Sequence, residues 1–373
     1  MIFLAVFCLL LSLIPLFMTW ENSRRFQKAI RDDHALQEAR KIPVSVLIPA
    51  RNEELSIERA LKSLLESQHE TLEIWVYDDA SEDRTAAIVD AISHVDPRVR
   101  RYPGGALPQG WNGKQHACFE LSKLATYEHL LFLDADVRVT PDAITRAVAQ
   151  MQATGVPLLS GFPRQETVTL GEQLLLPMMY VLLLGYLPIQ RMRTKLDAGL
   201  AAGCGQFFLA QRAAYRSVDG HRSIAASRHD GIQLPRAFRK KGLGTDIFDA
   251  SDIAICRMYH NWGQVVRGLL KNATEGIANP KLILVFTLLL GSFSWIPALI
   301  MGSQLQSWNG VSVICLLALG IGVITRLRIS QTLGLALWPA LVHPMSVTVF
   351  VLLQWIAFGM AIVGKQLRWR GRI

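Results

Sequence analysis

Apolar residues form long uninterrupted blocks near both ends of the chain and only short runs between them. Residues 1–20 contain no charged side chain, and uncharged stretches of similar length recur from position 282 onwards. A helix of about 20 apolar residues is long enough to cross the hydrocarbon core of a bilayer. The pattern therefore predicts membrane-spanning helices at both ends and a water-exposed domain between them.

The middle of the chain predicts strands and helices in alternation. Residues 44–48 and 72–77 are short apolar runs typical of buried strands, whereas residues 53–65 and 83–92 have apolar side chains at helical spacing. A further buried strand ends at Leu133. Successive strand–helix units favour a parallel, doubly wound sheet with right-handed crossovers, so we predict a Rossmann-like α/β domain.

Acidic residues stand where the predicted strands end. Asp79 follows the second strand, and Asp134 and Asp136 follow the strand that ends at Leu133. The carboxyl ends of parallel strands meet at the ligand-binding edge of an open sheet, and alternate residues of an extended segment point the same way. A divalent cation that keeps several waters needs only one or two carboxylates, plus phosphate oxygens from a substrate. Asp134 and Asp136 are thus a candidate metal site, the alternative being two acids in a solvated turn.

A glycine-rich loop, residues 107–114, leads into a predicted helix and carries Lys114 close to the start of that helix. The N-terminus of a helix and an ammonium group both favour an anion, so Lys114 is well suited to a diphosphate. An ordinary loop with a solvated lysine is the alternative interpretation.

The composition lies between that of a soluble enzyme and that of a membrane bundle. Hydrophobic residues make up 51% of the chain and charged residues 18%, with a mean hydropathy of +0.26. The net charge of +9 comes from basic residues clustered beside the apolar blocks, which is typical of cytoplasmic membrane flanks rather than of a nucleic-acid partner. The five cysteines show no C-x-x-C spacing, so neither a disulfide framework nor a zinc site is indicated.

Basic residues follow the N-terminal apolar block, at Arg24, Arg25, Lys28 and Arg31. A signal peptide would carry them before its apolar core and would end in a small-residue cleavage site. We therefore interpret the block as an anchor, and the positive-inside rule places the following domain in the cytoplasm.

Two apolar segments do not fit a simple span. If residues 173–189 crossed the membrane alone, Asp136 and everything after Arg191 would lie on opposite sides, so we expect an interfacial or core helix there. Residues 332–363 are too long for one ordinary span and short for two. We expect this segment to bend near His343 and Pro344, as a short hairpin or re-entrant pair.

Three segments, 44–54, 78–85 and 134–136, resemble the motifs of the family 2 glycosyltransferases, which have the GT-A fold. Segments 111–118, 257–259 and 369–372 are similar to a narrower group of these enzymes. That group contains the membrane glycosyltransferases of carotenoid (4,4'-diaponeurosporenoate type) and hopanoid pathways and, more distantly, the ceramide glucosyltransferases. The resemblance extends over nearly the whole chain.

The resemblance implies a nucleotide-sugar donor, expected to be a UDP-sugar, at the edge of the sheet. It implies that Asp79 contacts the base or ribose, that Asp134 contacts the ribose or the metal-bound phosphates, and that Asp136 ligates Mg²⁺ or Mn²⁺ together with Asp134. A cation there would stabilise the charge that develops on the leaving diphosphate. The other donor-binding residues that the resemblance implies are Pro49, Ala50, Arg51, Glu53 and Lys114.

The acceptor-side motif departs from the family pattern. Asp230 is the candidate catalytic base, because an inverting transferase needs a base within hydrogen-bond reach of the acceptor hydroxyl. Gly231 follows it where a second acid is usual, and a helix-capping aspartate is the alternative role for Asp230. A carboxylic acid acceptor would need no strong base. Gly268 replaces the tryptophan of the Gln-x-x-Arg-Trp motif of polymer synthases, which favours transfer of a single sugar.

The expected protein is therefore a multi-pass glycosyltransferase of the cell membrane with a cytoplasmic catalytic domain. Its expected partners are a nucleotide sugar, a lipid acceptor such as a carotenoid or hopanoid, and the membrane, with no nucleic acid. The expected parts are an N-terminal transmembrane anchor (1–22), a GT-A domain (43–260), an interfacial helix (261–278), a C-terminal transmembrane region (279–364) and a basic cytosolic tail (365–373).

Two other kinds of function share some of these features. Within enzymes, the alternatives are transfer onto a polyprenyl phosphate and synthesis of a polysaccharide. A non-catalytic scaffold or exporter component would keep the fold without turnover. Such a descendant would be expected to lose some of the candidate residues, yet Asp79, Lys114, Asp134, Asp136 and Asp230 are all present.

Overall fold

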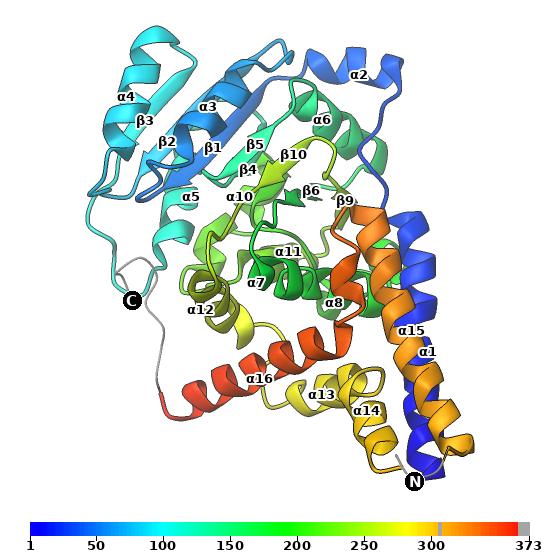
Figure 1. Cartoon of the computed structure of the whole chain (residues 1–373). Helices are drawn as coiled ribbons and strands as arrows, with labels where there is room; N and C mark the ends of the chain where they lie inside the picture. The colour runs from blue at the N-terminus through cyan, green and yellow to red at the C-terminus, as the bar shows by residue number, and fades with distance from the viewer. Residues whose placement is uncertain (305–307, 365–373) are drawn as a thin grey trace. The chain divides into compact units, whose positions relative to one another are not determined.

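The structure is a computed structural model that describes residues 1–304 and 308–364 (Figure 1). The described chain forms two compact units. The sheet unit comprises Phe26–Glu166 and Arg191–Met258. The helical unit comprises Met1–Arg25, Thr167–Gln190 and the described residues from Tyr259 onwards. The predicted basic tail, residues 365–373, lies outside the described residues.

A seven-stranded mixed sheet is the centre of the sheet unit. In spatial order its strands are β3 (Val99–Pro103), β2 (Leu72–Asp78), β1 (Val44–Ala50), β4 (His129–Leu133), β8 (Phe207–Gln211), β6 (Leu158–Phe162) and β9 (Thr245–Asp249). Strands β1 to β4 are mutually parallel, whereas β8 is antiparallel to both β4 and β6. The predicted α/β class is confirmed. The antiparallel β8 is an addition that places the start of this strand beside the end of β4.

A second, three-stranded sheet brings distant segments together. Its order is β5 (Val137–Val139), β10 (Ala254–Cys256) and β7 (Arg164–Gln165). In the antiparallel pairing of β10 with β5, Cys256 is opposite Val137. The residue that precedes β5 is Asp136, so this pairing carries Cys256 to the candidate metal-binding acid.

Both faces of the main sheet are buried, as a sheet with parallel strands requires. Along β1, Val44, Val46 and Ile48 belong to one core, whereas Leu47 belongs to another, because successive side chains point to opposite faces. The first core includes residues of α2 (Asp33–Arg40), α3 (Ile57–Leu65), α4 (Thr85–Val95) and α6 (Ala143–Thr154). The second includes residues of α5 (Gly113–Leu124), α10 (Arg212–Ser217), the 3-10 helix η2 (Gly220–Ile224) and α11 (Asp230–Lys240).

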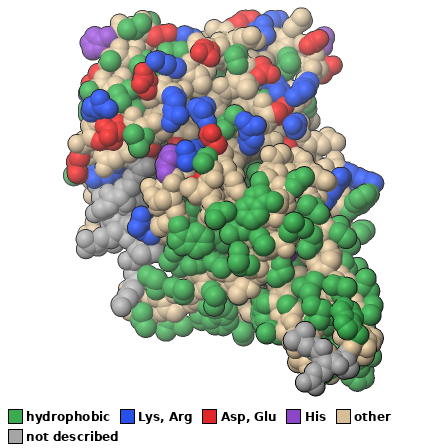
Figure 2. All heavy atoms as spheres, in the orientation of Figure 1, with side chains coloured by type: hydrophobic (Ala, Val, Ile, Leu, Met, Phe, Trp, Pro, Cys, Tyr) green, Lys and Arg blue, Asp and Glu red, His purple; other side chains and the backbone are tan. Residues whose placement is uncertain are grey.

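Helix α1 (Ile2–Arg25) packs against α15 (Gly310–Leu333) more extensively than any other described element does. By length and composition, three described helices could cross a membrane, namely α1, α15 and α16 (His343–Ile362). Figure 2 shows hydrophobic side chains gathered over the helical unit and charged side chains gathered over the sheet unit. An apolar surface of this extent on the helical unit is suited to lipid rather than to water.

The first part of the apolar region that begins at residue 282 forms two helices, α13 (Ile283–Gly291) and α14 (Trp295–Gly302), bent by 55°. The break contains Ser292 and Ser294, whose hydroxyls donate to the carbonyls of Leu289 and Leu290. Serine hydroxyls that bond back to a helix compete with its own ladder and bend it.

The bend expected near His343 and Pro344 coincides with the start of α16. Pro344 is accepted there because the first turn of a helix needs no N–H donor from it. After the bend the chain forms one helix of 20 residues. Figure 1 shows α16 crossing the direction of α1 and α15 instead of running beside them. The 3-10 helix η3 (Trp338–Ala340) precedes it.

Residues 173–189 are interrupted by Pro177, which separates α7 (Leu170–Leu175) from α8 (Met178–Tyr186). Proline has no N–H, so the carbonyl of Gln173, four residues earlier, loses its helical partner. The fully buried Arg326 of α15 donates to this carbonyl (3.2 Å) and to that of Leu174 (3.4 Å). The charge of Arg326 thus completes the end of a broken helix, where the helix dipole favours a cation.

Helix α12 (Trp262–Ala273) contains Gly268, the position at which polymer synthases have tryptophan. A side-chain carbon at Gly268 would overlap the Tyr259 hydroxyl. The ring of Tyr259 therefore occupies the space that any larger residue at 268 would need.

Candidate functional site

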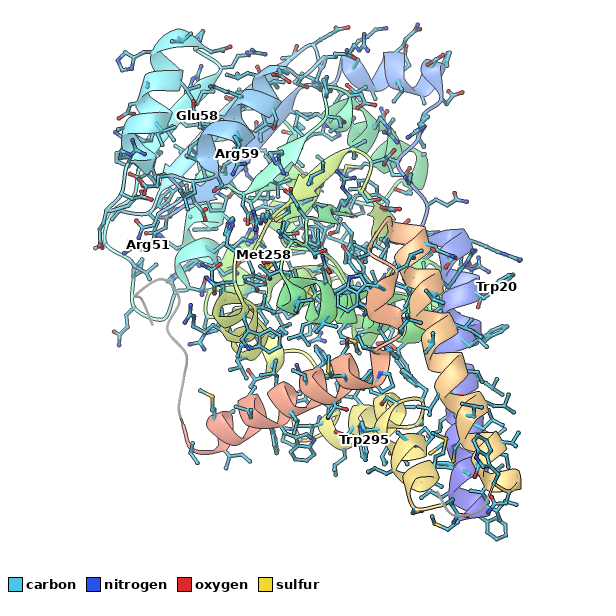
Figure 3. The ribbon with its side chains drawn as sticks, in the orientation of Figure 1. Trp20, Arg51, Glu58, Arg59, Met258 and Trp295 are labelled. Carbon is cyan, nitrogen blue, oxygen red and sulfur yellow. The ribbon has the colours of Figure 1, made fainter. Side chains whose placement is uncertain are left out.

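The loops that follow β1 and β2 are locked together by hydrogen bonds. Arg51, labelled in Figure 3, is buried and donates from Nη1 to the carbonyls of Asp79 (2.6 Å) and Ala80 (2.9 Å). In return, the Asp79 N–H donates to the carbonyl of Ala50 at the end of β1 (2.8 Å). The predicted donor-binding residues Ala50, Arg51 and Asp79 are therefore held in one cluster.

The backbone on both sides of this lock is left-handed, with φ of 53° at Asn52 and 51° at Ala80. Asparagine tolerates this region, whereas alanine adopts it at a cost. The Asn52 side chain accepts a hydrogen bond from the Glu82 N–H, and the Glu53 N–H donates to Thr85 Oγ1. These contacts explain why α3 and α4 begin at Ile57 and Thr85, later than the expected starts.

A group of rings lies beside the Asp79 loop. The Tyr77 hydroxyl is 3.3 Å from His116 Nδ1, and the Trp111 ring meets that of His116 edge to face. Burial and the nearby Asp79 carboxylate raise the pKa of Tyr77 to about 12, and burial lowers the pKa of His116. These rings are neutral at pH 7, and the sequence analysis did not identify Tyr77 or His116 as candidates.

One ammonium group joins three segments at the carboxyl edge of the sheet. Lys114 Nζ is 2.6 Å from Asp134 Oδ1, 2.9 Å from Asp230 Oδ2 and 3.0 Å from the Gly205 carbonyl oxygen. Lys114 is the second residue of α5, whose N-cap Asn112 accepts from the Lys114 N–H. Three residues predicted separately from the sequence are therefore in direct contact.

Burial dominates the pKa of Asp134 and raises it to about 6, although the Lys114 ammonium opposes this shift. Burial also acts to raise the pKa of Asp230, but Lys114 outweighs it and lowers that pKa to about 2. The pKa of Lys114 is raised well above its ordinary value, because the two carboxylates outweigh its burial. At neutral pH the cluster is one cation between two acids.

Asp230 is the first residue of α11, and its Oδ1 accepts the Gly231 N–H (2.9 Å). One oxygen of this carboxylate therefore binds a backbone N–H in the first turn of α11, whose N-cap is His229, while the other oxygen binds Lys114. Two glycines make the position possible. A side-chain carbon at Gly205 would overlap the Asp230 carboxylate, and one at Gly231 would lie 2.6 Å from the Gly203 carbonyl oxygen.

Gly231→Asp, which would restore the second acid of the family pattern, is expected to destabilise the sheet unit. The obstacle is backbone, the Gly203 carbonyl, which cannot swing away as a side chain can, so we expect a loss of about 1–3 kcal/mol. Thermal unfolding of the purified chain tests this. The matched control is Gly244→Ala, whose nearest atom would be a Val156 methyl carbon at 3.6 Å. Equal stability of the two variants would contradict the prediction.

His221 is buried beside this cluster and was not identified from the sequence. Its Nδ1 is 2.7 Å from the Tyr215 hydroxyl, and its ring packs against Phe132. Burial lowers its pKa from 6.5 to about 3, so the ring is neutral at physiological pH. A single histidine next to an Asp-Gly turn gives no recognisable sequence signal.

The stability of the sheet unit is expected to fall on acidification because of His221. Below pH 6.5 the unfolded chain binds a proton that the folded chain refuses until about pH 3. Between these limits the free energy of unfolding decreases as the pH is lowered, by up to about 2 kcal/mol from pH 7 to pH 5. Thermal midpoints at both pH values test this. His221→Asn, which cannot titrate, should show a smaller change, and an unchanged pH dependence would contradict the assignment.

Asp136 lies two residues beyond Asp134, and its Oδ1 is buried without a hydrogen-bond partner among the described residues. Next to it, Cys256 Sγ accepts from Gln206 Nε2 (2.9 Å), and the Gln206 carbonyl accepts the Asp134 N–H (3.1 Å). No group of three or more His, Cys, Asp or Glu side chains in the described chain could by itself hold a metal ion. Two acids with an unused oxygen fit a cation that takes its other ligands from phosphate and water.

The other predicted residues flank these clusters. Pro49 and Ala50 are the last residues of β1, paired with Tyr77 and Asp78. The Glu53 carboxylate accepts from Ser56 Oγ at the start of α3 (2.8 Å).

The sheet unit is similar to a known family of enzymes. Residues 45–218 match the model of glycosyl transferase family 2, a range that begins in β1 and includes Lys114, Asp134 and Asp136. The matched range covers just under half of the chain and shows what the sheet unit is similar to. Asp230 lies beyond the matched range, so its assignment rests on its contact with Lys114.

Two curated relatives support this family. The chain is 28% identical over 243 residues to 4,4'-diaponeurosporenoate glycosyltransferase of Staphylococcus haemolyticus (strain JCSC1435), covering 64% of this chain and 63% of the relative. It is 26% identical over 272 residues to the protein of the same name from Staphylococcus aureus (strain USA300), covering 69% and 68%. The match spans somewhat less than two thirds of the first relative.

A solved structure is similar in fold over most of this chain. It is a mannosyltransferase, PcManGT from Pyrobaculum calidifontis, in complex with GDP-Man and Mn²⁺. The TM-score is 0.57 at 18% identity, with 95% of this chain and 98% of that one covered. At this identity the likeness establishes the GT-A fold predicted from the sequence.

Proposed function

We propose that this chain is a membrane glycosyltransferase that moves a single sugar from a nucleotide diphosphate sugar to a lipid acceptor. The observation that carries the proposal is the contact of Lys114 with both Asp134 and Asp230. The Lys114 ammonium lies between these two acids at the edge of the α/β sheet. We assign the side of Asp134 to the donor diphosphate and the side of Asp230 to the acceptor oxygen. The family of the domain agrees with this chemistry.

On the donor side, Asp79 is assigned to the base or ribose, in the loop that Arg51 fixes. Pro49, Ala50 and Glu53 complete the wall of this subsite. Lys114 is assigned to the diphosphate, since both its ammonium and the N-terminus of α5 favour an anion. A UDP-sugar is the donor that we expect.

Asp136 and Asp134 would hold Mg²⁺ or Mn²⁺ on the diphosphate. When bound, the ion supplies positive charge where the leaving group becomes negative. The buried, unpartnered Oδ1 of Asp136 fits this role. Gln206 and Cys256, which lie next to the two acids, would keep them in place.

On the acceptor side, Asp230 is the proposed base, and its environment suggests the kind of acceptor. With a pKa lowered to about 2, it is ionised at all physiological pH values but is a weak base. A weak base is adequate when the acceptor oxygen is already acidic, as in a carboxylic acid. The proposal therefore favours a lipid carboxylate, in line with the name diaponeurosporenoate glycosyltransferase that the relatives carry.

The experiment that tests the function is transfer by the full chain in lipid nanodiscs. UDP- and GDP-sugars labelled in the sugar would be offered with a long-chain carotenoic acid, its alcohol or a polyprenyl phosphate. We expect label in the organic phase with the acid and one UDP-sugar, as a one-sugar product by mass spectrometry. Product only with polyprenyl phosphate, or a polymer, would favour the alternative enzymes. No product with any donor would contradict the proposal.

The proposed topology places the sheet unit in the cytoplasm and the loop before α15 outside. A cysteine introduced at Trp308, an exposed position, should react in intact cells with a membrane-impermeant maleimide. A cysteine in place of the exposed Glu82 should react only after permeabilisation. Both are compared with the parent chain, which has its own five cysteines. The reverse labelling pattern would mean that the topology is opposite to the one proposed. Ser307, in the same loop, lies outside the described residues.

A further inference from the structure

The C-terminal ends of α1 and α15 meet in the helical unit. Ser23 near the end of α1 receives a hydrogen bond from Thr332 near the end of α15 (3.4 Å). The two helices therefore run in the same direction, and Arg24 of α1 and Arg328 of α15 lie towards this end. Trp20 of α1, labelled in Figure 3, is half exposed one turn before this end.

Two arginines lie against the Trp20 ring, one from each helix. The guanidinium carbon of Arg24 is 5.4 Å from the ring centroid, and that of Arg328 is 5.1 Å from it. Each contact is a cation–π interaction, which holds a flexible side chain at a defined place. Two cations from two helices are thus fixed beside a single indole.

Neither arginine has a carboxylate partner in the described chain. The one acid nearby on α1, Glu21, is 2.9 Å from Arg25 and is therefore already paired. The Glu172 carboxylate of α7 accepts backbone N–H groups at the start of its own helix. The Nε of Arg328 is buried without a hydrogen-bond acceptor among the described residues. The positive charges of Arg24 and Arg328, and the unused Nε–H of Arg328, therefore lie close together beside the Trp20 ring.

We propose that Trp20, Arg24 and Arg328 form a binding site for the phosphate of an anionic membrane phospholipid. Tryptophan prefers the headgroup level of a bilayer, where its ring contacts acyl chains and its N–H meets water. Basic pockets between membrane helices bind anionic headgroups on the cytoplasmic side. Guanidinium groups pair with phosphate through two parallel hydrogen bonds. The site is in the helical unit and does not depend on the proposed function.

Lipid binding to the purified full-length chain, measured by native mass spectrometry, tests the site. Phosphatidylglycerol is the probe and phosphatidylcholine of the same chain length the reference. We expect one phosphatidylglycerol to bind more tightly than phosphatidylcholine. Arg24→Gln with Arg328→Gln should weaken that binding about 10- to 30-fold, since each basic residue near a headgroup contributes a factor of about five. The matched control is Arg59→Gln with Arg216→Gln, which removes two exposed charges from the sheet unit and should leave binding unchanged.

Further measurements decide between explanations. Arg24→Gln alone, at an exposed position, should weaken binding a few-fold and decides the question if the double variant does not fold. Arg24→Lys with Arg328→Lys keeps the charge but loses the paired hydrogen bonds, and should bind less tightly than the parent. Equal affinity for the two lipids, an equal loss in the control variant, or an unaffected double variant would each overturn the proposal. Displacement of the lipid by millimolar inorganic phosphate would mean a site for soluble anions and would also overturn it.

Discussion

Asp136→Asn is expected to lower sugar transfer by about 100-fold or more while leaving the fold intact. The substitution removes a charge that would stabilise the diphosphate through the cation, and losses of this size follow the removal of one major electrostatic stabiliser. Stability should be unchanged or slightly higher, because Oδ1 of Asp136 is buried without a partner in the described structure. The neutral isostere keeps the shape of the side chain and removes the cost of burying that oxygen as part of a charge.

Transfer rate and thermal midpoint are measured on the same preparation of this variant. Asp33→Asn, which removes a carboxylate from the exposed start of α2, is the matched control and should transfer at the parental rate. Chelation with excess EDTA should reduce parental activity as strongly as the substitution does, and added Mn²⁺ or Mg²⁺ should restore it. Full parental activity in EDTA would contradict the assignment of Asp134 and Asp136 as metal ligands.

Lys114→Met is expected to reduce transfer at least as strongly, and for two reasons together. It removes the charge assigned to the diphosphate, and it leaves Asp134 and Asp230 as two buried acids without their shared cation. One of them should then bind a proton near neutral pH, as closely spaced carboxylates do. We expect a loss of about 100-fold or more in kcat/KM.

The pH dependence of stability separates this explanation from general misfolding. In the parent chain, the lowered pKa of Asp230 contributes stability that is present above pH 3.8 and lost as the pH falls towards 2. In Lys114→Met the pKa of that acid should be raised, so the variant should gain stability relative to the parent when the pH is lowered from 8 to 5. Lys114→Arg, which keeps the charge, should behave like the parent in this measurement. A stability deficit of Lys114→Met that is independent of pH would contradict the shared-cation arrangement.

Several parts of this protein follow from the sequence because they depend on local pattern. Strand β1 and the carboxylates after β2 and β4 are readable from short apolar runs and the polar residues that end them. Lys114 near the start of α5 follows from the glycine-rich loop before it. The apolar blocks of α1 and α15 are recognisable by length alone. In each case a few consecutive residues contain the information.

Other parts were decided by contacts between residues far apart in the chain. Helix α3 begins later than predicted because Arg51 and Asn52 form hydrogen bonds with the loop after β2. The helix propensity of residues 53–56 contains no information about these long-range bonds. The bend between α13 and α14 arises from two serines within an otherwise apolar run, which hydropathy averages over.

The site shows the same division. Local patterns are enough to identify the acids and the lysine at the sheet edge, since strand ends and helix starts fix them. Contacts across the fold establish that Lys114 holds Asp134 and Asp230 together, that His221 is buried beside them, and that Gly203 and Gly205 leave no room for a second acid at 231. The physical reason is that charge pairing, burial and close backbone approach depend on distances across the fold, and residue spacing along the chain carries no measure of them.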